Sequence, residues 1–367
     1  MADAARPRAL VLADDFADRH VLRGPALDRL ARSAQVTVLP AAADEETVLA
    51  ELRRSTALFA LGWAVSSPRL DRDRLADAPG LRYIGAGQDG RWRFVDVPAA
   101  LSRGVVCSDA SGAMGPVVAE FAFALAVCAL RDLPRRHNLM AAGGWWDGWE
   151  DGEDAASEGC RPSVSTVFGS RVGIVGFGRI GSHAAALFRA AGAEVTVHSS
   201  WLPEREASAR GLSLAASVGD LAKGSDILVV ATQPRHDTAG LVSADVLDAL
   251  PDGALVVLVG RASTVDTTAL LAHVAAGRLR LGVDVYEEEP LPAHHRLRGM
   301  PGVVHTSHVA GRTLAAHRLV LTELVADFER VLAGSAPRWA TTADRVRRVR
   351  AGRPYAAPRT AVGESDS

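Results

Sequence analysis

A glycine-rich turn between two apolar segments constrains the fold of this chain more than any other feature. The turn has the sequence GFGRIG and covers residues 176–181. It follows an apolar run at residues 171–175 and opens a helical pattern that ends at Gly192, directly before a second apolar run at residues 194–197. Strand, turn, helix and strand fit within the ~30 residues of a βαβ unit, which predicts a parallel sheet in an α/β fold.

The spacing of the three glycines is typical of a turn that binds a dinucleotide. Gly176 permits the tight turn, Gly178 permits close approach of the backbone to a pyrophosphate, and Gly181 lets the helix pack on the strand. The N-terminus of the helix favours an anion because its N–H groups are unpaired. A glycine-rich turn that binds no cofactor is the alternative. We expect cofactor contacts from Gly176, Gly178, Arg179, Ile180 and Gly181.

The length of the chain indicates more than one domain. Its 367 residues are roughly two to three times the common domain size. Hydrophobic residues make up 48% of the chain, enough for sizeable cores. The formal net charge of −2 is too small to indicate a nucleic acid or a membrane surface as partner. The longest apolar run, residues 121–130, is too short to span a bilayer and predicts a buried helix.

The three cysteines indicate neither disulfides nor a metal site. Cys107, Cys128 and Cys160 are odd in number and widely spaced, and none belongs to a C-x-x-C pair. They are typical of reduced thiols. The N-terminal residues lead directly into a strand pattern at residues 9–13, without the charged and apolar regions of a signal peptide. We therefore expect a cytoplasmic protein without a bound metal.

Two blocks of alternating strand and helix patterns predict two parallel α/β domains. The first block is residues 1–112, and the second is residues 113–312, which contain the glycine turn. A helical pattern at residues 313–334 is expected to return to the first domain and complete it. Residues 335–367 have little apolar surface to bury, so we expect a mobile tail there.

Three residues with side chains suited to catalysis follow the glycine turn. Arg261 lies in VVLVGRASTVD, Glu289 in GVDVYEEEPLP and His308 in VVHTSHVAGRT. Taken alone, each has a commoner structural explanation, namely a surface ion pair, a solvated acidic run and a hydrogen-bonded histidine. Together they match the needs of 2-oxo acid reduction, which requires a hydride donor, a cation on the carboxylate and ketone oxygens, and a general acid. The ends of different strands of one sheet would bring them to one crevice.

Each of the three side chains suits one catalytic role. The planar guanidinium of Arg261 pairs with two oxygens at once and keeps its charge. His308 suits the general acid because imidazole titrates near neutral pH. The carboxylate of Glu289 would orient His308 and favour its protonated form.

Several phrases in consistent order resemble the D-isomer-specific 2-hydroxyacid dehydrogenase family over roughly residues 81–332. They are LRYIGAG, VDVPAALSRGVVCSDASG, VVAEFAFAL, VGIVGFGRIG and the three phrases that carry the catalytic candidates. The resemblance implies two Rossmann-like parallel-sheet domains, of which the substrate domain is made from both chain ends. It also implies an active site in the interdomain cleft, and a homodimer.

The resemblance assigns further residues by their position in these phrases. Asp284 matches the family's aspartate that holds the nicotinamide carboxamide, although it could equally cap a strand end. Val118 would line the nicotinamide pocket, or else is part of the core. The backbone N–H groups of Ala86, Gly87 and Gln88 would hold the substrate carboxylate, in a loop that is longer here than in the family.

The end of the second cofactor strand departs from the family's pattern. Ser199 stands where NAD-preferring members have an aspartate, and Ser200 follows it. Loss of that carboxylate removes an acceptor for the ribose diol and a repulsion against a 2′-phosphate. We expect both serines to contact the cofactor, and NADP to be used at least as well as NAD. Arg205 is the nearest cation in sequence that could bind the extra phosphate.

These features predict an oxidoreductase that transfers a hydride between a nicotinamide cofactor, NAD(P), and a 2-oxo acid or D-2-hydroxy acid. Two alternatives keep the same fold. A dinucleotide-sensing scaffold of the corepressor type need not retain all three catalytic candidates. A phosphite-type dehydrogenase has a lysine in the substrate loop, and this chain has none there. A formate dehydrogenase belongs to the same alternative, but these enzymes have a glutamine at the position of Glu289, so Glu289 argues against it.

Overall fold

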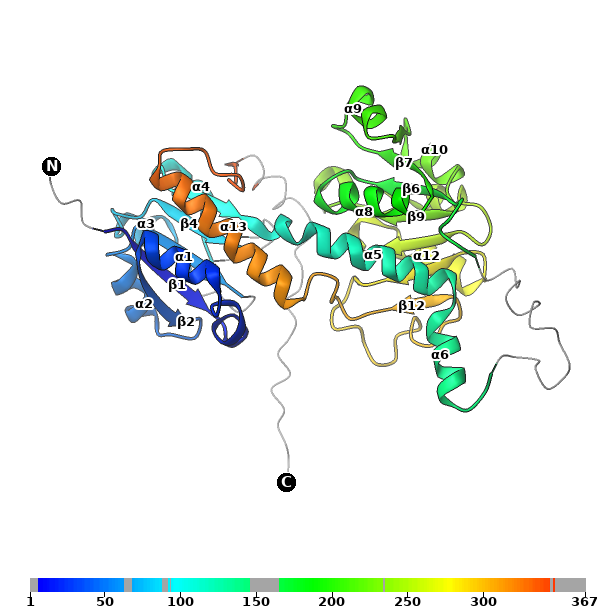
Figure 1. Cartoon of the computed structure of the whole chain (residues 1–367), viewed down its shortest axis with the longest axis horizontal. Helices are drawn as coiled ribbons and strands as arrows, with labels where there is room; N and C mark the ends of the chain where they lie inside the picture. Colours follow the sequence, from blue (N-terminus) through cyan, green and yellow to red (C-terminus); the bar gives the residue numbers. More distant parts are fainter. Residues whose placement is uncertain are drawn as a thin grey trace, which may run out of the picture. The chain divides into compact units, whose positions relative to one another are not determined.

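The computed structural model describes residues 6–62, 68–87, 92, 94–145, 165–233, 235–343 and 346. The chain divides into two compact units. Unit 1 contains Met1–Gly115 and Gly311–Ala351, and the described residues of unit 2 lie in Pro116–Ala310. Each unit has a parallel sheet of its own, which confirms the predicted fold class (Figure 1).

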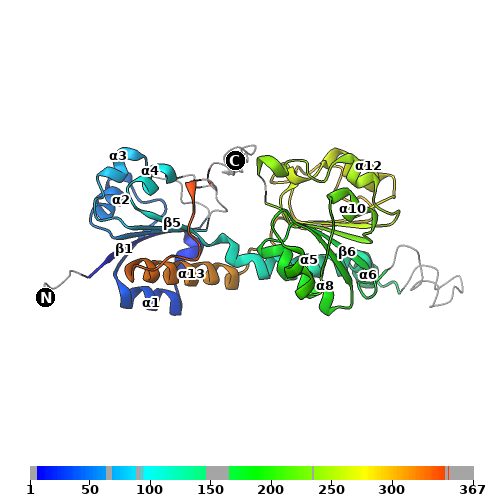
Figure 2. The same cartoon turned by 90° about the horizontal axis from the view of Figure 1, so that it is seen from above.

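Unit 1 is built on a five-stranded parallel sheet with the order β2-β1-β3-β4-β5. Figure 2 shows α1 and α13 on one face of this sheet and α2, α3 and α4 on the other. The strands are β1 Arg8–Ala13, β2 Gln35–Pro40, β3 Ala57–Leu61, β4 Tyr83–Ala86 and β5 Val106–Asp109. The helices are the π-helical η1 Ala17–Val21, α1 Pro25–Ser33, α2 Glu45–Leu52, α3 Arg72–Ala76, α4 Val97–Ser102, the 3-10 helix η2 Ala110–Met114, and α13 Leu314–Leu332.

Helices on both faces explain the apolar sequence of the central strands of unit 1. Every residue of β3 is buried, as expected for a strand covered from both sides. The C-terminal helix α13 supplies much of one layer, since Phe328 packs edge-on against Phe59 with ring centroids 5.7 Å apart. The hydroxyl of Tyr83 donates a hydrogen bond to the carbonyl of Leu324 at 2.9 Å. Residues from the two ends of the sequence therefore share one core.

The residues directly after α13 are packed on unit 1, so the prediction of a mobile tail from residue 335 is wrong for its first part. Trp339 is buried, and its N–H and that of Arg338 donate to the carboxylate of Asp327 at 2.8 and 2.6 Å. Ala340 forms an antiparallel bridge with Ser108. One indole and one buried carboxylate hold this segment, and a polar sequence pattern does not show such anchors. Residues 347–367 lie outside the described residues.

Unit 2 is built on a seven-stranded parallel sheet with the order β12-β11-β10-β9-β6-β7-β8. The chain order reverses between β6 and β9, as in the dinucleotide-binding Rossmann fold. The strands are β6 Arg171–Val175, β7 Glu194–His198, β8 Ser213–Leu214, β9 Ile227–Val230, β10 Leu255–Leu258, β11 Arg280–Val283 and β12 Val303–His305. The helices are α5 Gly115–Leu130, α6 Leu133–Ala141, α8 Arg179–Ala190, α9 Glu204–Ala209, α10 Val218–Lys223, α11 Ala244–Asp248 and α12 Thr267–Ala275, with short 3-10 helices η3 His236–Thr238 and η4 Ala262–Thr264.

The sheet of unit 2 is also covered on both faces. Figure 2 shows α5 and α8 on one side and α10 and α12 on the other. Strands β9 (ILVV) and β10 (LVVL) are buried at every position, which accounts for their unbroken apolar sequences. Two layers of helices therefore enclose the central strands of unit 2.

The apolar helix of residues 110–130 is longer than the predicted run of residues 121–130. The 3-10 helix η2 continues directly into α5, giving 21 residues that by length and composition alone would suffice to cross a membrane. Buried residues of α5 pack in the core of unit 2, among them Ala122, Leu125 and Ala126. Part of the helix is therefore a core element, which agrees with the predicted buried helix.

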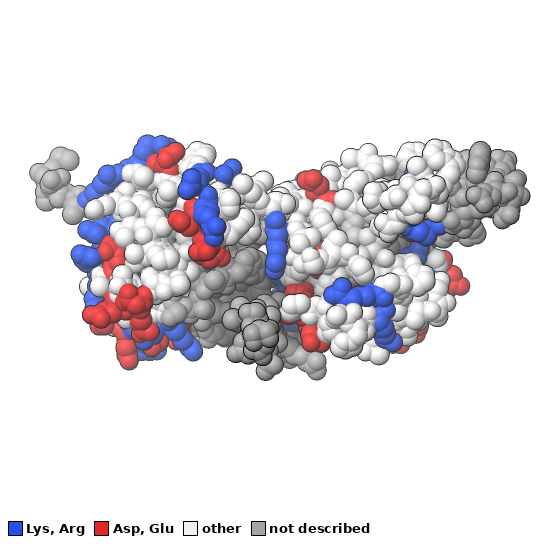
Figure 3. Space-filling model, turned by 90° about the horizontal axis from the view of Figure 1, so that it is seen from below, with Lys and Arg blue, Asp and Glu red and all other residues white. Residues whose placement is uncertain are grey.

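Charges of both signs are interspersed on the face shown in Figure 3, where the described Lys and Arg side chains lie among Asp and Glu. No broad patch of one sign is visible among the described residues on this face. This agrees with the small net charge of −2.

Candidate active site

The carboxyl ends of the unit 2 strands lie in one row across the sheet. The strand register pairs Val175 of β6 with Val230 of β9, Val230 with Leu258 of β10, Leu258 with Val283 of β11, and Val283 with His305 of β12. The glycine turn, Arg261, Asp284 and His308 each follow the end of one of these strands. A parallel sheet therefore brings residues that are far apart in sequence to a single edge, the usual ligand side of this fold.

The glycine turn has the geometry that the sequence predicts. Gly176 has a φ of +93°, and a β-carbon there would lie 2.6 Å from the hydroxyl oxygen of Thr232. A β-carbon on Gly181 would lie 2.0 Å from the carbonyl oxygen of Gly176, so this glycine lets α8 pack against the turn. Gly178 precedes α8, and a β-carbon there would meet no atom within 4 Å. The space above Gly178 is therefore open to a ligand.

Strand β7 ends beside the glycine turn. The N–H of Gly176 donates to the carbonyl of His198 at 2.9 Å. The hydroxyl of Ser199 accepts hydrogen bonds from the N–H groups of Trp201 and Leu202 at 3.4 and 3.3 Å, so it closes the turn after β7. Ser200 is exposed. The structure thus gives Ser199 a backbone-capping contact that the sequence did not predict.

Arg261 lies beyond β10, where the backbone leaves the sheet. It precedes the short helix η4, and its carbonyl accepts from the hydroxyl of Thr264 at 2.7 Å. Its guanidinium donates to the carbonyl of Gly260 at 2.7 Å. The side chain is half-buried, which places a permanent cation at the ligand edge of the sheet.

Asp284 is fully buried at the end of β11 and binds the loop that carries His308. Its carboxylate accepts from the Thr306 hydroxyl at 2.6 Å and from the N–H groups of Val309 and Ala310 at 2.9 and 3.0 Å. These three bonds surround His308, which has a left-handed φ of +56°. Such a backbone conformation is uncommon outside glycine and needs support from its surroundings. The described contacts of Asp284 match the strand-end alternative.

Glu289 and His308 form a close pair. The Nδ1 atom of His308 lies 2.7 Å from Oε2 of Glu289, and the other carboxylate oxygen accepts from the N–H of Tyr286 at 3.0 Å. Both side chains are mostly buried, since that of His308 is 21% exposed and that of Glu289 is 11% exposed. Glu287 and Glu288 are exposed, so the structure singles out one glutamate of the acidic run. With Nδ1 held by the carboxylate, Nε2 is the imidazole nitrogen that remains for a substrate.

Tyr286 supports the same pair from the sheet side. Its hydroxyl donates to the carbonyl of Thr306 at 2.6 Å, so it ties the segment before Glu289 to the segment before His308. Burial raises the pKa of Tyr286 to about 12, and nearby Asp284 adds to the shift. The phenol therefore stays protonated and keeps donating across the neutral pH range.

A family model for these residues decides the identity of the chain. The model of the D-isomer specific 2-hydroxyacid dehydrogenase NAD binding domain matches residues 123–310, just over half of the chain. The chain belongs to the D-isomer specific 2-hydroxyacid dehydrogenase family. The predicted resemblance is confirmed, and with it an oxidoreductase that uses a nicotinamide cofactor.

Individual members of the family are similar over much of the chain. A glyoxylate reductase from Aeropyrum pernix is 31% identical over 275 residues, which are 73% of this chain and 77% of that protein. A D-3-phosphoglycerate dehydrogenase from Mycobacterium tuberculosis is 30% identical over 295 residues. That match covers 79% of this chain but 52% of the relative, so the chain spans about half the length of this dehydrogenase.

A solved structure in this dehydrogenase family has the same fold. The NADPH-dependent glyoxylate/hydroxypyruvate reductase from Sinorhizobium meliloti, solved with citrate, is 26% identical to the chain with a TM-score of 0.70. The match covers 92% of this chain and 98% of the reductase.

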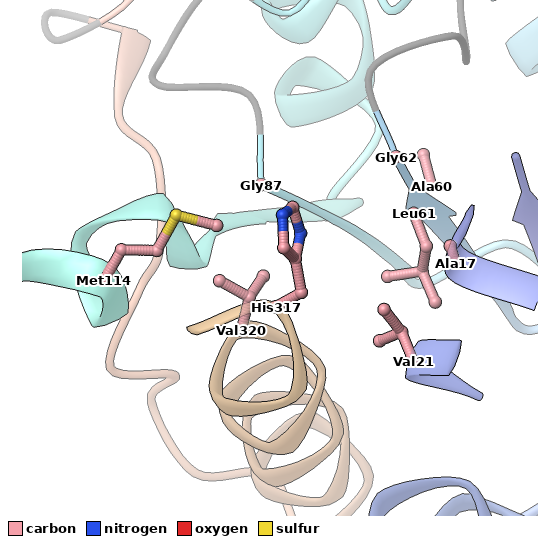
Figure 4. A pocket seen from close by; sticks show the side chains of 9 residues that line it. All are labelled: Ala17, Val21, Ala60, Leu61, Gly62, Gly87, Met114, His317 and Val320. Carbon is pink, nitrogen blue, oxygen red and sulfur yellow. The ribbon is translucent and has the colours of Figure 1, made fainter. Parts of the chain in front are cut away.

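Unit 1 carries the residues that the family resemblance assigns to the substrate carboxylate. Ala86 is the last residue of β4 and is buried. Gly87 follows it and lines a small hollow that is partly open to solvent (Figure 4). Gln88 lies outside the described residues. In unit 2, Val118 is partly buried and packs on the core, in line with its structural alternative.

The hollow of unit 1 contains one side chain that the sequence did not single out, His317 of α13. Figure 4 shows His317 and Val320 rising from this helix, with Met114 on one side and Leu61 on the other. Burial lowers the pKa of His317, Asp14 opposes that shift, and Arg312 adds to it. The hollow lies at the carboxyl ends of β3 and β4, and sequence patterns alone do not show that α13 packs there. The lining is Ala17, Val21, Ala60, Leu61, Gly62, Gly87, Met114, His317 and Val320.

The described tryptophans lie in different parts of the two units. Trp92 is buried in the core of unit 1, and Trp145 is exposed after α6. Trp63, Trp146 and Trp149 lie outside the described residues, as does Cys160. Trp201, which no sequence motif marks as functional, lies next to the glycine turn.

Proposed function

We propose that this dehydrogenase interconverts a 2-oxo acid and a D-2-hydroxy acid, with Arg261, Glu289 and His308 as the catalytic residues. The observation that carries the proposal is the 2.7 Å contact between Glu289 and His308 at the sheet edge that also carries the glycine turn. A buried carboxylate–imidazole pair is a common device for holding a general acid in one orientation.

Different residues donate the proton and stabilise the negative charge of the reaction. In the reductive direction a hydride adds to C2 of the 2-oxo acid, and the carbonyl electron pair moves onto oxygen. Nε2 of His308 donates its proton to that oxygen, which completes the 2-hydroxy acid. Arg261 binds the carboxylate and the developing oxyanion, since its planar fork fits two oxygens and its charge is permanent.

The residues of the glycine turn fit a nicotinamide dinucleotide. The open space above Gly178 and the N–H groups of the first turn of α8 suit a pyrophosphate. When bound, the nicotinamide supplies or accepts the hydride. The chain itself holds the dinucleotide at the carboxyl end of β6, in the sheet whose strand β12 precedes His308.

We propose that NADPH is used at least as well as NADH. Ser199 offers no carboxylate to the ribose diol and no charge against a 2′-phosphate. The NADPH-dependent reductase of Sinorhizobium meliloti is consistent with this choice within the family.

Glyoxylate and hydroxypyruvate are the substrates that the named relatives suggest first. Incubation with NADPH and a panel of 2-oxo acids, followed by chiral separation of the products, tests the proposal. The D-isomer of a 2-hydroxy acid is expected. A chain that binds NADPH tightly but turns over no acid of the panel would instead support the scaffold alternative.

We also propose a cytoplasmic homodimer. Helix α6 has no buried residue within the described chain, and its Leu133 and Met140 side chains are 44% and 49% exposed. Apolar side chains on an uncovered helix suit contact with a second copy. Sedimentation velocity should give a dimer, and Leu133→Glu with Met140→Glu should give a monomer; a wild-type monomer would contradict the proposal.

A further inference from the structure

An exposed indole lies beside the glycine turn. Trp201 follows the end of β7 by three residues and is 59% exposed. Its ring centroid is 6.0 Å from that of Phe177, the second residue of the glycine turn. Phe177 is 3% exposed and packs in the core, so it gives the Trp201 ring a fixed support.

A guanidinium rests on the same phenylalanine. Arg210 directly follows α9, and its guanidinium carbon lies 5.7 Å from the centroid of the Phe177 ring. Its side chain is 52% exposed and pairs with Glu206 at 2.6 Å. Arg205, the cation that is nearer to Ser199 in sequence, has no described contact with Phe177. The fold thus brings the more distant arginine to the turn.

The strand order places these two side chains toward one end of a bound dinucleotide. The pyrophosphate belongs at the start of α8, and in this fold the adenosine ribose meets the end of the neighbouring strand, here β7. His198 and Gly176 are joined by a 2.9 Å hydrogen bond, so the end of β7 is directly beside the turn. His308 lies past β12, at the opposite edge of the sheet from β7.

We infer that Trp201 stacks on the adenine and that Arg210 binds the 2′-phosphate of NADPH. This inference rests on the proposed nicotinamide cofactor and names the residues that select its form. An exposed indole that is supported from behind offers a flat face to a base. This stacking is lost when the ring is removed. A guanidinium pairs with phosphate oxygens through two parallel N–H groups.

Two nearby carboxylates set the balance of charge at this site. Glu206 holds Arg210 in the structure, and Glu204 is exposed at the start of α9. A 2′-phosphate must therefore draw Arg210 away from Glu206. The pair is exposed and four residues apart on one helical turn, so breaking it costs little.

Isothermal titration calorimetry of the full chain with NADPH and with NADH tests both assignments without any turnover. Arg210→Gln should raise the Kd for NADPH about tenfold, the usual scale of a lost charged contact, and leave the Kd for NADH within about twofold. Trp201→Ala should raise both Kd values by a similar factor, on the order of tenfold, because both cofactors contain adenine. Trp201→Phe keeps an aromatic face and should recover most of the affinity.

A variant that is expected to strengthen NADPH binding provides a second test. Glu206→Gln frees Arg210 and should lower the Kd for NADPH, with little change for NADH. Lys223→Gln is the matched control, since Lys223 and Asp220 form a similar exposed pair, 3.4 Å apart, on α10. It should leave both Kd values unchanged.

The outcomes separate this inference from the proposed function. If the wild-type chain binds neither NADPH nor NADH, the proposed cofactor itself is wrong. If it binds them but Arg210→Gln leaves their ratio unchanged, or Arg205→Gln changes it instead, the assignment of Arg210 is overturned. Equal affinity of Trp201→Ala and wild type for both cofactors would overturn the stacking role.

Discussion

The Nδ1 atom of His308 lies 2.7 Å from Oε2 of Glu289, and the loop around His308 is held by the buried carboxylate of Asp284. One carboxylate therefore orients the imidazole, and another fixes the backbone that presents it. The left-handed φ of +56° at His308 follows from this double support. Both supports come from the segment of residues 284–289, which directly follows β11.

We predict that Glu289 acts by orienting His308. The carboxylate of Glu289 lies 2.7 Å from Nδ1 of His308, and Glu289→Gln keeps the size of the side chain but can turn an NH2 group toward that nitrogen. Reductive kcat/KM should therefore fall about tenfold or more in Glu289→Gln, and further in His308→Ala. Steady-state kinetics with NADPH checks both variants. An unchanged kcat/KM in Glu289→Gln would contradict the orienting role.

We predict that Asp284→Asn destabilises the loop that carries His308. The amide can offer only one oxygen to the three donors that the carboxylate satisfies, so a buried N–H loses its partner at a cost of about 1–3 kcal/mol. Urea unfolding should show the loss of stability. Asp248→Asn is a fitting control, because the side chain of Asp248 is 64% exposed and pairs with His273. Equal stability of Asp284→Asn and wild type would contradict the anchoring role.

The fold and the catalytic candidates were predictable because short-range sequence patterns carry them. The glycine spacing fixed the βαβ unit, and Arg261 and His308 follow apolar strand patterns whose ends a parallel sheet brings together. The contact between Arg210 and Phe177 was not predictable, since it depends on how α9 turns back toward the sheet. The packing of Trp339 was not predicted for a similar reason, because it depends on a hydrogen bond to the carboxylate of Asp327 in α13.

We predict that Arg261 acts on the substrate more than on the cofactor. Arg261→Lys keeps the charge but loses the fork that binds two oxygens, so kcat/KM should fall about tenfold or more. The Kd for the dinucleotide should stay within about twofold of wild type, which calorimetry can check. A cofactor Kd that rose as much as kcat/KM fell would show that Arg261 serves the dinucleotide instead.

We predict that the ion pair between Arg171 and Asp226 makes unit 2 sensitive to acid. The hydrogen bond from Arg171 lowers the pKa of Asp226, burial opposes the shift, and the charge of Arg171 adds to it. A lowered folded-state pKa means that the stabilisation is present above the unfolded value near pH ~4 and is lost as pH falls through the folded value.

The size of this acid effect is limited by solvent. The side chains of Arg171 and Asp226 are 50% and 41% exposed, so we expect no more than about 1 kcal/mol after screening. Asp226→Asn should lower the unfolding free energy at neutral pH, and its difference from wild type should shrink in acid. Asp15→Asn should show little effect at either pH, because the side chain of Asp15, which pairs with Arg19, is 88% exposed. A difference for Asp226→Asn that grew in acid would contradict the sign.

The most direct test of the central claim is the rate of NADPH oxidation with glyoxylate or hydroxypyruvate, compared between wild type and His308→Ala at equal cofactor occupancy. The pairing of Glu289 with His308 predicts turnover by the wild-type chain and a loss of kcat of about a hundredfold or more in the variant, with an unchanged Kd for NADPH. Equal kcat in the two proteins would contradict the claim that His308 is the general acid.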